Sequence, residues 1–222
     1  VTSMGIVSGG GGITVAHELM HRTGRLERGL AELLMASVCY PHFCVEHVFG
    51  HHRWVGTPRD PATARRGQSL YAFLPQTIVG SLRSFARIEA ERARRLGLRG
   101  LADARLRHPL LVWAFLMAAG VAFGPAGMLV FVGQSVVAVL LLEAINYVEH
   151  YGLERRAIGE GRWERVRPEH SWNSSHRLTG LYLFNLPRHA DHHYLASRPY
   201  AVLRHLDDSP QLPAGYATMV LV

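Results

Sequence analysis

Histidine is the residue type with the clearest chemical potential here, because the 222-residue sequence contains fourteen histidines and most of them fall into short clusters. Neutral imidazole is a good ligand for iron, zinc, copper or nickel. Side chains three or four residues apart lie on one face of a helix, so a cluster with that spacing can direct several imidazoles at one point. The clusters therefore predict a metal site, with the candidate ligands His17, His21, His47, His51, His52, His150, His189, His192 and His193.

The first cluster, HELMH at residues 17–21, also matches the HExxH pattern of zinc peptidases, in which Glu18 would act as the base. Such a peptidase needs three protein ligands and an open position on a single zinc ion. Most of the other clustered histidines would then have no role. So many imidazoles instead suit two metal ions with roughly four or five ligands each. The two-metal site is the favoured interpretation, and the zinc peptidase is the alternative.

Four carboxylates lie beside candidate ligands in the sequence: Glu18, Glu46, Glu149 and Asp191. Metal-bound imidazoles usually donate their second N–H to a carboxylate, a carbonyl or a water molecule. We therefore expect these four to orient ligands, although each is equally compatible with an ordinary helix-end charge. No catalytic residue is expected beyond the metal ligands themselves.

The clearest membrane element is the stretch 109–149, which carries almost no charge before Glu143. Its second half alone is long enough to cross a bilayer at ~1.5 Å per residue. The break at Gly124-Pro125 predicts a helical hairpin whose two ends return to one side, which places His150 on the same side as Arg107. A buried helical hairpin of a soluble protein is the alternative.

The remaining segments are expected to position the other clusters. Residues 4–22 are predicted to form the end of a membrane helix, weakened locally by four consecutive glycines, Gly9–Gly12. Residues 30–52 are apolar and interrupted by Pro41. If His21 and His47 share a site, this segment must lie in the interface or turn back near Pro41.

Three further segments are polar. Residues 53–69 are predicted to be a loop, and residues 70–98 an amphipathic helix at the membrane surface or in the cytoplasm. Residues 150–222 contain no further convincing span. We therefore expect one all-α domain over residues 1–222, an integral membrane helical bundle. The apolar start at Val1–Ala16 predicts that early membrane helices are missing.

The charge and cysteine content narrow the function further. The formal net charge of +7 comes from arginine alone, without a compact basic stripe or a nucleic-acid motif, so we expect no nucleic-acid partner and favour cytoplasmic loops beside membrane spans. The cysteines Cys39 and Cys44 form no CxxC pair. This argues against a disulfide framework, a zinc knuckle or a fused iron–sulfur module of the rubredoxin type.

Several motifs together resemble one family. The first, second and fourth clusters resemble the three histidine boxes of membrane fatty-acid desaturases and hydroxylases. Their flanks are similar to those of the bacterial alkane 1-monooxygenases, as is the extra box around His150, over essentially the whole chain. The motifs are HELMHR, EHVFGHHRWVGTPRDPATAR, NYVEHYGL, RPEHSWNSSH and RHADHH followed by DDSPQLPAGY.

This resemblance implies a six-helix protein of the bacterial inner membrane with two iron ions on the cytoplasmic side, held by the nine histidines named above. It implies O₂-dependent hydroxylation of the terminal methyl group of alkanes, with electrons from rubredoxin and its reductase. The alternatives are a related membrane hydroxylase of aryl-methyl or terpene substrates, a fatty acyl desaturase, and a homologue that binds metal without catalysis.

The other histidines are not expected to be ligands. His170 and His176 lie in the HSWNS segment and are expected to support the site or the fold. His42, His108 and His205 are expected to be bystanders. The last box departs from the family pattern because Pro187 precedes it, although proline is tolerated in the first turn of a helix.

Overall fold

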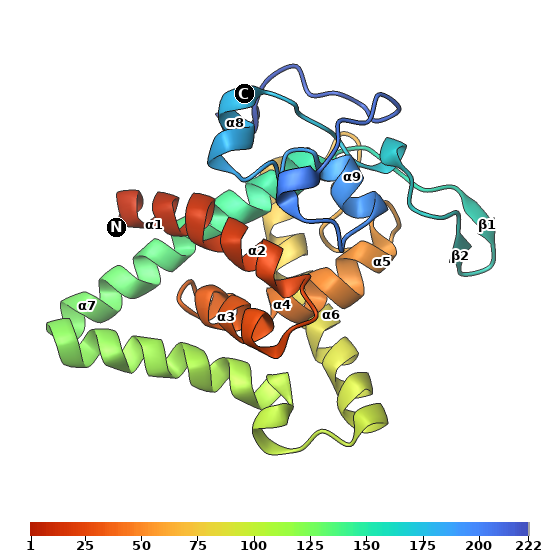
Figure 1. Ribbon diagram of the computed structural model, residues 1–222. Coiled ribbons are helices and arrows are strands. Elements are labelled where there is room, and N and C mark those ends of the chain that lie inside the picture. The colour runs from red at the N-terminus through yellow and green to blue at the C-terminus, as the bar shows by residue number, and fades with distance from the viewer. Residues whose placement is uncertain (222) are drawn as a thin grey trace. The chain divides into compact units, whose positions relative to one another are not determined.

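The computed structural model describes residues 1–221, and the chain divides into two compact units. Unit 1 comprises residues 1–50 and 81–142, and unit 2 comprises residues 51–80 and the chain from residue 143 onward. Unit 1 is mostly helical, and helices are also the main regular structure of unit 2 (Figure 1). The prediction of a mainly helical protein is therefore confirmed, whereas the expectation of a single domain stays a prediction.

The N-terminal helix of unit 1 runs without interruption through the glycine-rich segment. It comprises α1 (Thr2–Val7), a π-helical turn η1 (Ser8–Ile13) and α2 (Thr14–Met20). A Cβ atom at Gly5 would lie 2.5 Å from the Val137 side chain, and one at Gly9 would lie 3.2 Å from the Ala138 backbone. Glycine at these two positions thus allows the helix to pack closely, as expected for small residues at helix contacts.

The chain turns back near Pro41, as predicted. The helix α3 (Arg25–Ala36) ends there, and α4 (Phe43–Glu46) begins after a short turn in which Cys39 adopts a left-handed conformation, with φ 57°. The main apolar core of unit 1 lies around this turn and includes Ile13, Met20, Met35, Val38, Tyr40 and Ala138.

The amphipathic helix α6 (Leu70–Leu96) agrees with the prediction for residues 70–98. It carries buried Phe85 into a small cluster with Val45 and Ala104. After a short 3-10 turn, η3 (Gly100–Ala102), the Glu89 carboxylate accepts a hydrogen bond of 3.0 Å from the Ala104 backbone N–H. This interaction satisfies a donor at the start of the next helix.

That helix, α7 (Ala104–His150), is the one helix among the described residues that is long and apolar enough to cross a membrane. Its backbone is not helical at Gly124, with φ 67° and ψ −163°, so the predicted break at Gly124-Pro125 is confirmed. The two arms are about 30 Å or longer at ~1.5 Å per residue. Near the bend they pack together, with the Phe115 and Phe131 rings stacked at 6.3 Å.

A bidentate ion pair joins the first arm of α7 to α3. The Arg107 guanidinium donates hydrogen bonds of 2.7 Å to both carboxylate oxygens of Glu32. Burial opposes ionisation of this carboxyl, but hydrogen bonds from His108 and Arg107 lower the pKa of Glu32 to about 2. Because charge-assisted bidentate pairs are strong, this contact fixes the start of α7 against α3.

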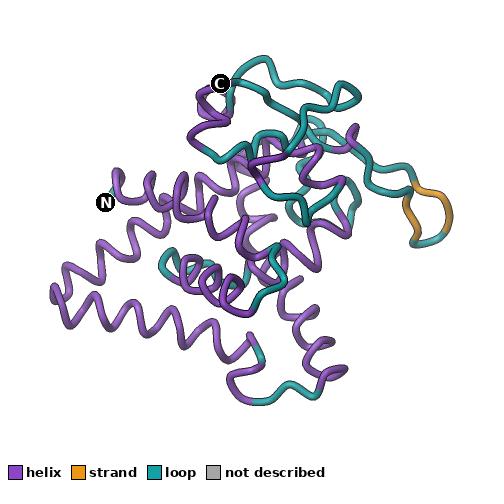
Figure 2. Tube along the Cα trace, viewed as in Figure 1, coloured by secondary structure: helices purple, strands orange, loops and turns teal. Residues whose placement is uncertain are grey.

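Unit 2 contains shorter elements joined by long loops (Figure 2). It has an apolar core of Val148, Leu183, Leu212 and Tyr216. Its two-stranded antiparallel hairpin, β1 (Ala157–Gly159) and β2 (Arg162–Trp163), was not predicted. The helical elements are η4 (Pro168–His170), α8 (Arg177–Tyr182), α9 (His189–Tyr194), η5 (Tyr200–Val202) and α10 (Tyr216–Leu221).

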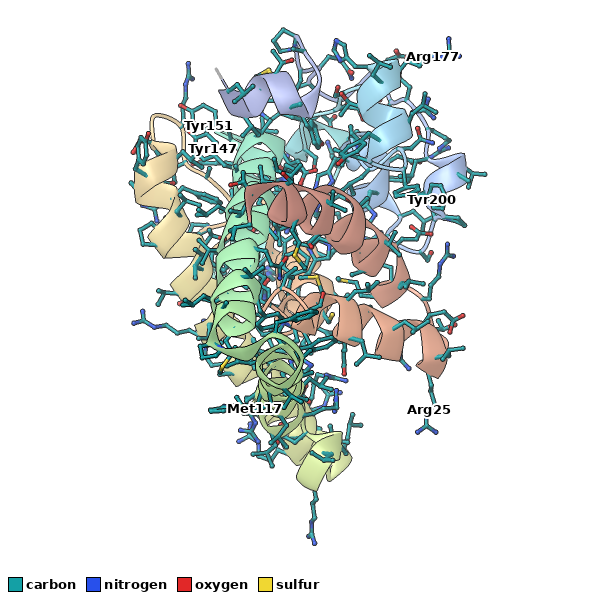
Figure 3. All side chains as sticks on the ribbon, turned by 90° about the vertical axis from the view of Figure 1, so that its left-hand side faces the viewer. Arg25, Met117, Tyr147, Tyr151, Arg177 and Tyr200 are labelled. Atoms are coloured by element: carbon teal, nitrogen blue, oxygen red, sulfur yellow. The ribbon has the colours of Figure 1, made fainter. Side chains whose placement is uncertain are left out.

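Two tyrosines near the end of α7 hold the loop before α6. The Tyr147 hydroxyl donates to the Gln68 carbonyl oxygen at 2.6 Å, and the Tyr151 hydroxyl accepts from the Gly67 N–H at 2.9 Å. Their rings lie 5.1 Å apart, one turn from each other (Figure 3). These contacts fix the end of α7, where His150 lies.

Candidate metal centre

Three of the candidate ligands lie together in unit 1. His17 is in α2, His21 follows its last residue, and His47 begins the π-helical turn η2 (His47–His51). The Nε2 atoms of His17 and His47 are 2.8 Å apart, and the His21 ring centroid lies 5.0 Å and 5.2 Å from those of His17 and His47. The spacing argument for His17 and His21 therefore agrees with the structure.

Four candidates converge in unit 2: His51, His150, His189 and His193, with one ligand nitrogen from each within 4.8 Å of the others. His189 lies at the centre of this group. Its Nε2 is 3.1 Å from Nε2 of His150 and 3.0 Å from Nε2 of His193. All four side chains are buried, and His150 is fully inaccessible to solvent.

The donor set of these four histidines suits a transition metal. Imidazole nitrogens bind such metals at about 2.1 Å, so two nitrogens at right angles around one ion lie roughly 3 Å apart. The Nε2 separations around His189 have this value. Burying several imidazoles with their ring nitrogens directed at each other is unfavourable unless a partner satisfies them, and a metal ion is such a partner.

The remaining two candidates form a pair in unit 2. His52 begins α5 (His52–Trp54) and His192 lies in α9, and their Nε2 atoms are 3.0 Å apart. His52 also stacks on the His193 ring at 4.3 Å. Every candidate ligand therefore lies close to at least one other candidate within its own unit.

The π-helical turn η2 changes one expectation. His47 and His51 were expected to share a helical face, yet His51 belongs to the group of four with His150, and His47 is close to His17 instead. In such a turn the hydrogen bonds join residues five apart. Such turns occur frequently at functional sites.

Asp60 orients His51, and the sequence argument missed it. Its Oδ2 accepts from Nδ1 of His51 at 2.9 Å and from the Thr63 hydroxyl at 2.5 Å, while its Oδ1 accepts from the Ala62 N–H at 3.1 Å. Burial opposes the charge, but His51 and Thr63 hold the pKa of Asp60 below its usual value. The available signal was the Asp-Pro turn in TPRDPATAR, directly after the second histidine cluster.

The four carboxylates named from the sequence behave differently from one another. Glu149 lies against a candidate ligand, with its Oε2 3.2 Å from Nε2 of His189. Asp191 instead pairs with Arg198 and Arg204, at 3.0 Å and 2.9 Å.

Glu18 forms an ion pair with Arg22, four residues further along the chain and just past the end of α2. Glu46 is buried in α4 beside Gly50, where a Cβ atom would lie 2.4 Å from the glutamate Oε1. Glu149 thus contacts a candidate ligand, but at the His189 nitrogen that also faces His150 and His193 rather than at the second ring nitrogen.

The histidines not expected to be ligands lie outside both ligand groups in the described chain. The His170 backbone oxygen lies 3.4 Å from Nδ1 of His150, and its ring accepts a hydrogen bond from the Arg167 N–H at 2.9 Å. His176 contacts the Ser174 hydroxyl at 2.9 Å, and His205 contacts the Ser175 hydroxyl at 2.8 Å.

The two bystanders in unit 1 are buried. His108 stacks on Phe85 at 5.4 Å, and His42 packs against Tyr40 at 4.2 Å. In unit 2, Pro187 precedes the N-cap of α9, and its carbonyl oxygen accepts from the Ser174 N–H at 2.8 Å. The proline therefore does not disturb the helix that carries His189.

Known proteins are similar to this chain over its whole length. The sequence model of the family described as fatty acid desaturase matches residues 1–222. Alkane 1-monooxygenases 2 and 1 of Pseudomonas aeruginosa are both 52% identical to the chain over its whole length. The hydroxylase component of a xylene/toluene monooxygenase of Pseudomonas putida is 30% identical, also over the whole chain. The chain spans 59% of the length of each of these relatives.

Proposed function

Because the chain belongs to the fatty acid desaturase family, we propose that it forms the ligand-bearing part of a membrane di-iron monooxygenase that converts medium- or long-chain alkanes to 1-alkanols with O₂. The observation that carries the proposal is the convergence of four buried imidazoles in unit 2. The similarity to two alkane 1-monooxygenases supports the reaction type and the substrate class.

We assign one iron ion to His51, His150, His189 and His193, whose ligand nitrogens converge in unit 2. The five other candidates, His17, His21, His47, His52 and His192, are proposed as iron ligands as well. Imidazole ligands without a thiolate cluster are compatible with iron. When bound, iron supplies the activation of O₂ and the cleavage of a strong C–H bond.

The protein's own part is to hold and orient the ligands and to exclude water. Asp60 accepts from Nδ1 of His51 and leaves Nε2 available to the metal. The His170 carbonyl oxygen is placed to do the same for His150. Such outer partners fix the tautomer and the ring orientation of a ligand. The buried setting keeps water from the site, which favours hydroxylation over side reactions.

The proposed setting is the bacterial inner membrane. The apolar helix α7, with its bend at Gly124, supplies a hairpin that crosses the membrane twice, and the histidines lie on the cytoplasmic side. The arginines near its ends favour that orientation by the positive-inside rule. The electron donor is a rubredoxin supplied by its reductase, and residues 1–222 act as one domain within a longer multi-pass protein.

The test combines metal analysis with product analysis on the purified membrane protein. We expect close to two iron ions per chain and a Mössbauer signal, together with conversion of octane or hexadecane to the 1-alkanol. A protein that holds one zinc ion and negligible iron would contradict the proposal and would support the zinc peptidase interpretation instead.

A second candidate function is hydroxylation of an aryl methyl group, because the relative at 30% identity is named as a xylene/toluene monooxygenase component. Both reactions attack a terminal methyl group, so the same ligand set would serve either of them. Parallel incubations with octane, xylene and a fatty acyl substrate distinguish the two, and they also detect the desaturase alternative through an unsaturated product.

A further inference from the structure

The proposed reaction needs electrons that its substrate does not supply. Hydroxylation follows R–H + O₂ + 2 e⁻ + 2 H⁺ → R–OH + H₂O, in which one oxygen atom enters the alcohol and the other is reduced to water. Within residues 1–221, the only groups of metal-ligating side chains are the histidine groups described above. The carrier protein of the proposed function has to dock on the surface near the ligands to deliver these two electrons. This inference rests on the proposed function.

A compact basic and aromatic surface directly follows the second histidine cluster in unit 2. It consists of Arg53, Trp54, Arg59 and Trp163 and is called the Arg–Trp platform here. The Arg59 guanidinium lies over both indole rings, 4.7 Å from that of Trp54 and 5.1 Å from that of Trp163. The Arg53 guanidinium lies 4.8 Å from the Trp54 ring, and the two indoles meet edge to face at 5.9 Å.

The platform is held rigidly beside the ligands. Arg155 donates hydrogen bonds to the carbonyl oxygens of Glu164, Arg53 and Val55 at 2.8, 3.0 and 3.3 Å. These bonds fasten the β1–β2 hairpin to α5, the short helix that begins at His52. Trp54 is therefore two residues from one candidate ligand and three from another, which gives electrons a short covalent path to the site.

The charge of the platform is available to a partner. Arg53 and Arg59 are exposed, and their guanidinium groups lie over indole rings. The nearby Glu164 carboxylate is engaged by the Arg156 backbone N–H at 2.8 Å. Arginine and tryptophan are also the residues most enriched at the energetic centres of protein interfaces.

The other arginine-rich groove is less suited to this role. It is a shallow hollow of about 690 Å³ in unit 1, lined by Arg87, Arg94 and Arg105 among others. Arg94 forms an ion pair with Glu91. Arg105 forms an ion pair with Asp103, with a shortest N–O distance of 2.6 Å. Two of its three cations are thus neutralised locally.

We propose that the Arg–Trp platform is the docking surface for an acidic one-electron carrier protein, which delivers the two electrons of each turnover one at a time. The positive charge steers the acidic carrier into contact, and the indoles provide the packed centre of the interface. The chain's net charge of +7 favours an acidic partner as well.

The test reverses charges on the platform in the iron-loaded, membrane-embedded protein, with a rubredoxin and its reductase as the probe. For the double variant Arg53→Glu/Arg59→Glu we expect the KM for rubredoxin to rise roughly tenfold or more at low ionic strength, because like charges now face the acidic carrier. The kcat at saturating rubredoxin should stay near that of the unchanged protein. The wild-type KM should itself rise with salt, since exposed charges are screened.

The matched control is Arg87→Glu/Arg95→Glu, which makes the same charge change on the exposed face of α6. An equal rise in KM for both variants would show that only the net charge of the protein matters, and it would overturn the docking assignment. An unchanged KM in the platform variant would overturn it as well. Single-turnover hydroxylation with chemically reduced enzyme, together with iron content, isolates the site itself. If the wild-type protein forms no alcohol in that assay, the proposed function is wrong. If the wild-type protein forms alcohol and the platform variant binds rubredoxin normally, only the docking assignment is wrong.

Discussion

At the scale of single residues, the hydrogen bond made by one ring nitrogen of a histidine ligand determines that the other nitrogen faces the metal. His51 illustrates this best, because a buried aspartate holds its Nδ1 and that aspartate is itself held by Thr63 and a backbone N–H. A ligand fixed in this way does not need to reorient when the metal binds. Part of the metal affinity therefore resides in residues that never touch the ion.

We accordingly predict that Asp60→Ala lowers iron content and hydroxylation activity by about 10- to 100-fold, the usual effect of losing an outer partner of a ligand. Asp60→Asn should lose less, because its amide oxygen can still accept from Nδ1 of His51. Asp207→Ala, at a highly exposed aspartate, is the control. Metal analysis and product formation measure both effects, and equal iron content in Asp60→Ala and Asp207→Ala would contradict the prediction.

The second residue-scale prediction concerns His150, which stands alone in the sequence and is fully buried in the group of four. If it binds iron, His150→Ala removes a direct ligand and should abolish hydroxylation and lower the iron content. His205→Ala should change neither, because His205 is exposed and contacts Ser175. His108 is not a matched control, since it is buried beside Phe85 and its loss would also affect folding. Near-normal iron in His150→Ala would remove it from the site.

At the scale of elements, periodicity and breaks in the sequence predicted much of the helical structure. The amphipathic pattern before Leu96, the turn near Pro41 and the bend at Gly124 are all present. These features depend on local preferences such as apolar spacing and the conformations open to glycine and proline. They are therefore visible without knowledge of tertiary contacts.

The features that the sequence did not reveal depend on interactions between distant residues. The contact of Asp60 with His51 crosses a loop, and the β1–β2 hairpin is held by Arg155. The π-helical turn that separates His47 from His51 has no distinctive composition. For the site, spacing and the family resemblance together selected the histidines, while the division of the set into smaller groups required the fold.

The glycines of the first helix give a prediction at this scale. Gly5→Leu should destabilise the protein by about 1–3 kcal/mol, because its Cβ would overlap the Val137 side chain. Gly11→Leu should be tolerated, since nothing lies within 4 Å of a Cβ at that position. Thermal unfolding in one detergent measures both variants. Equal loss of stability would show that helix propensity rather than close packing governs this segment.

At the scale of the whole molecule, metal binding and folding should be coupled. Buried imidazoles without a metal ion lose their hydration and gain few compensating partners, so the folded state binds the metal more tightly than the unfolded chain does. We predict that removing iron with a chelator lowers the midpoint of thermal unfolding and that adding ferrous iron restores it. Differential scanning calorimetry of the purified protein tests this, and identical midpoints with and without iron would contradict it.

The arrangement in the membrane is the last prediction, and α7 decides it. Its two arms pack through Phe115 and Phe131 beside the bend, and each is long enough to span the apolar layer. A hairpin returns both of its ends to one face, so single cysteines near Arg107 and Arg155 should be labelled from the cytoplasm, and one near Gly124 from the opposite side. Cys39 and Cys44 must first be replaced by alanine, so that only the introduced thiol reacts. If the cysteines near Arg107 and Arg155 were labelled from opposite faces, α7 would have to cross the membrane only once. His150 would then lie on the opposite side of the membrane from the start of the helix.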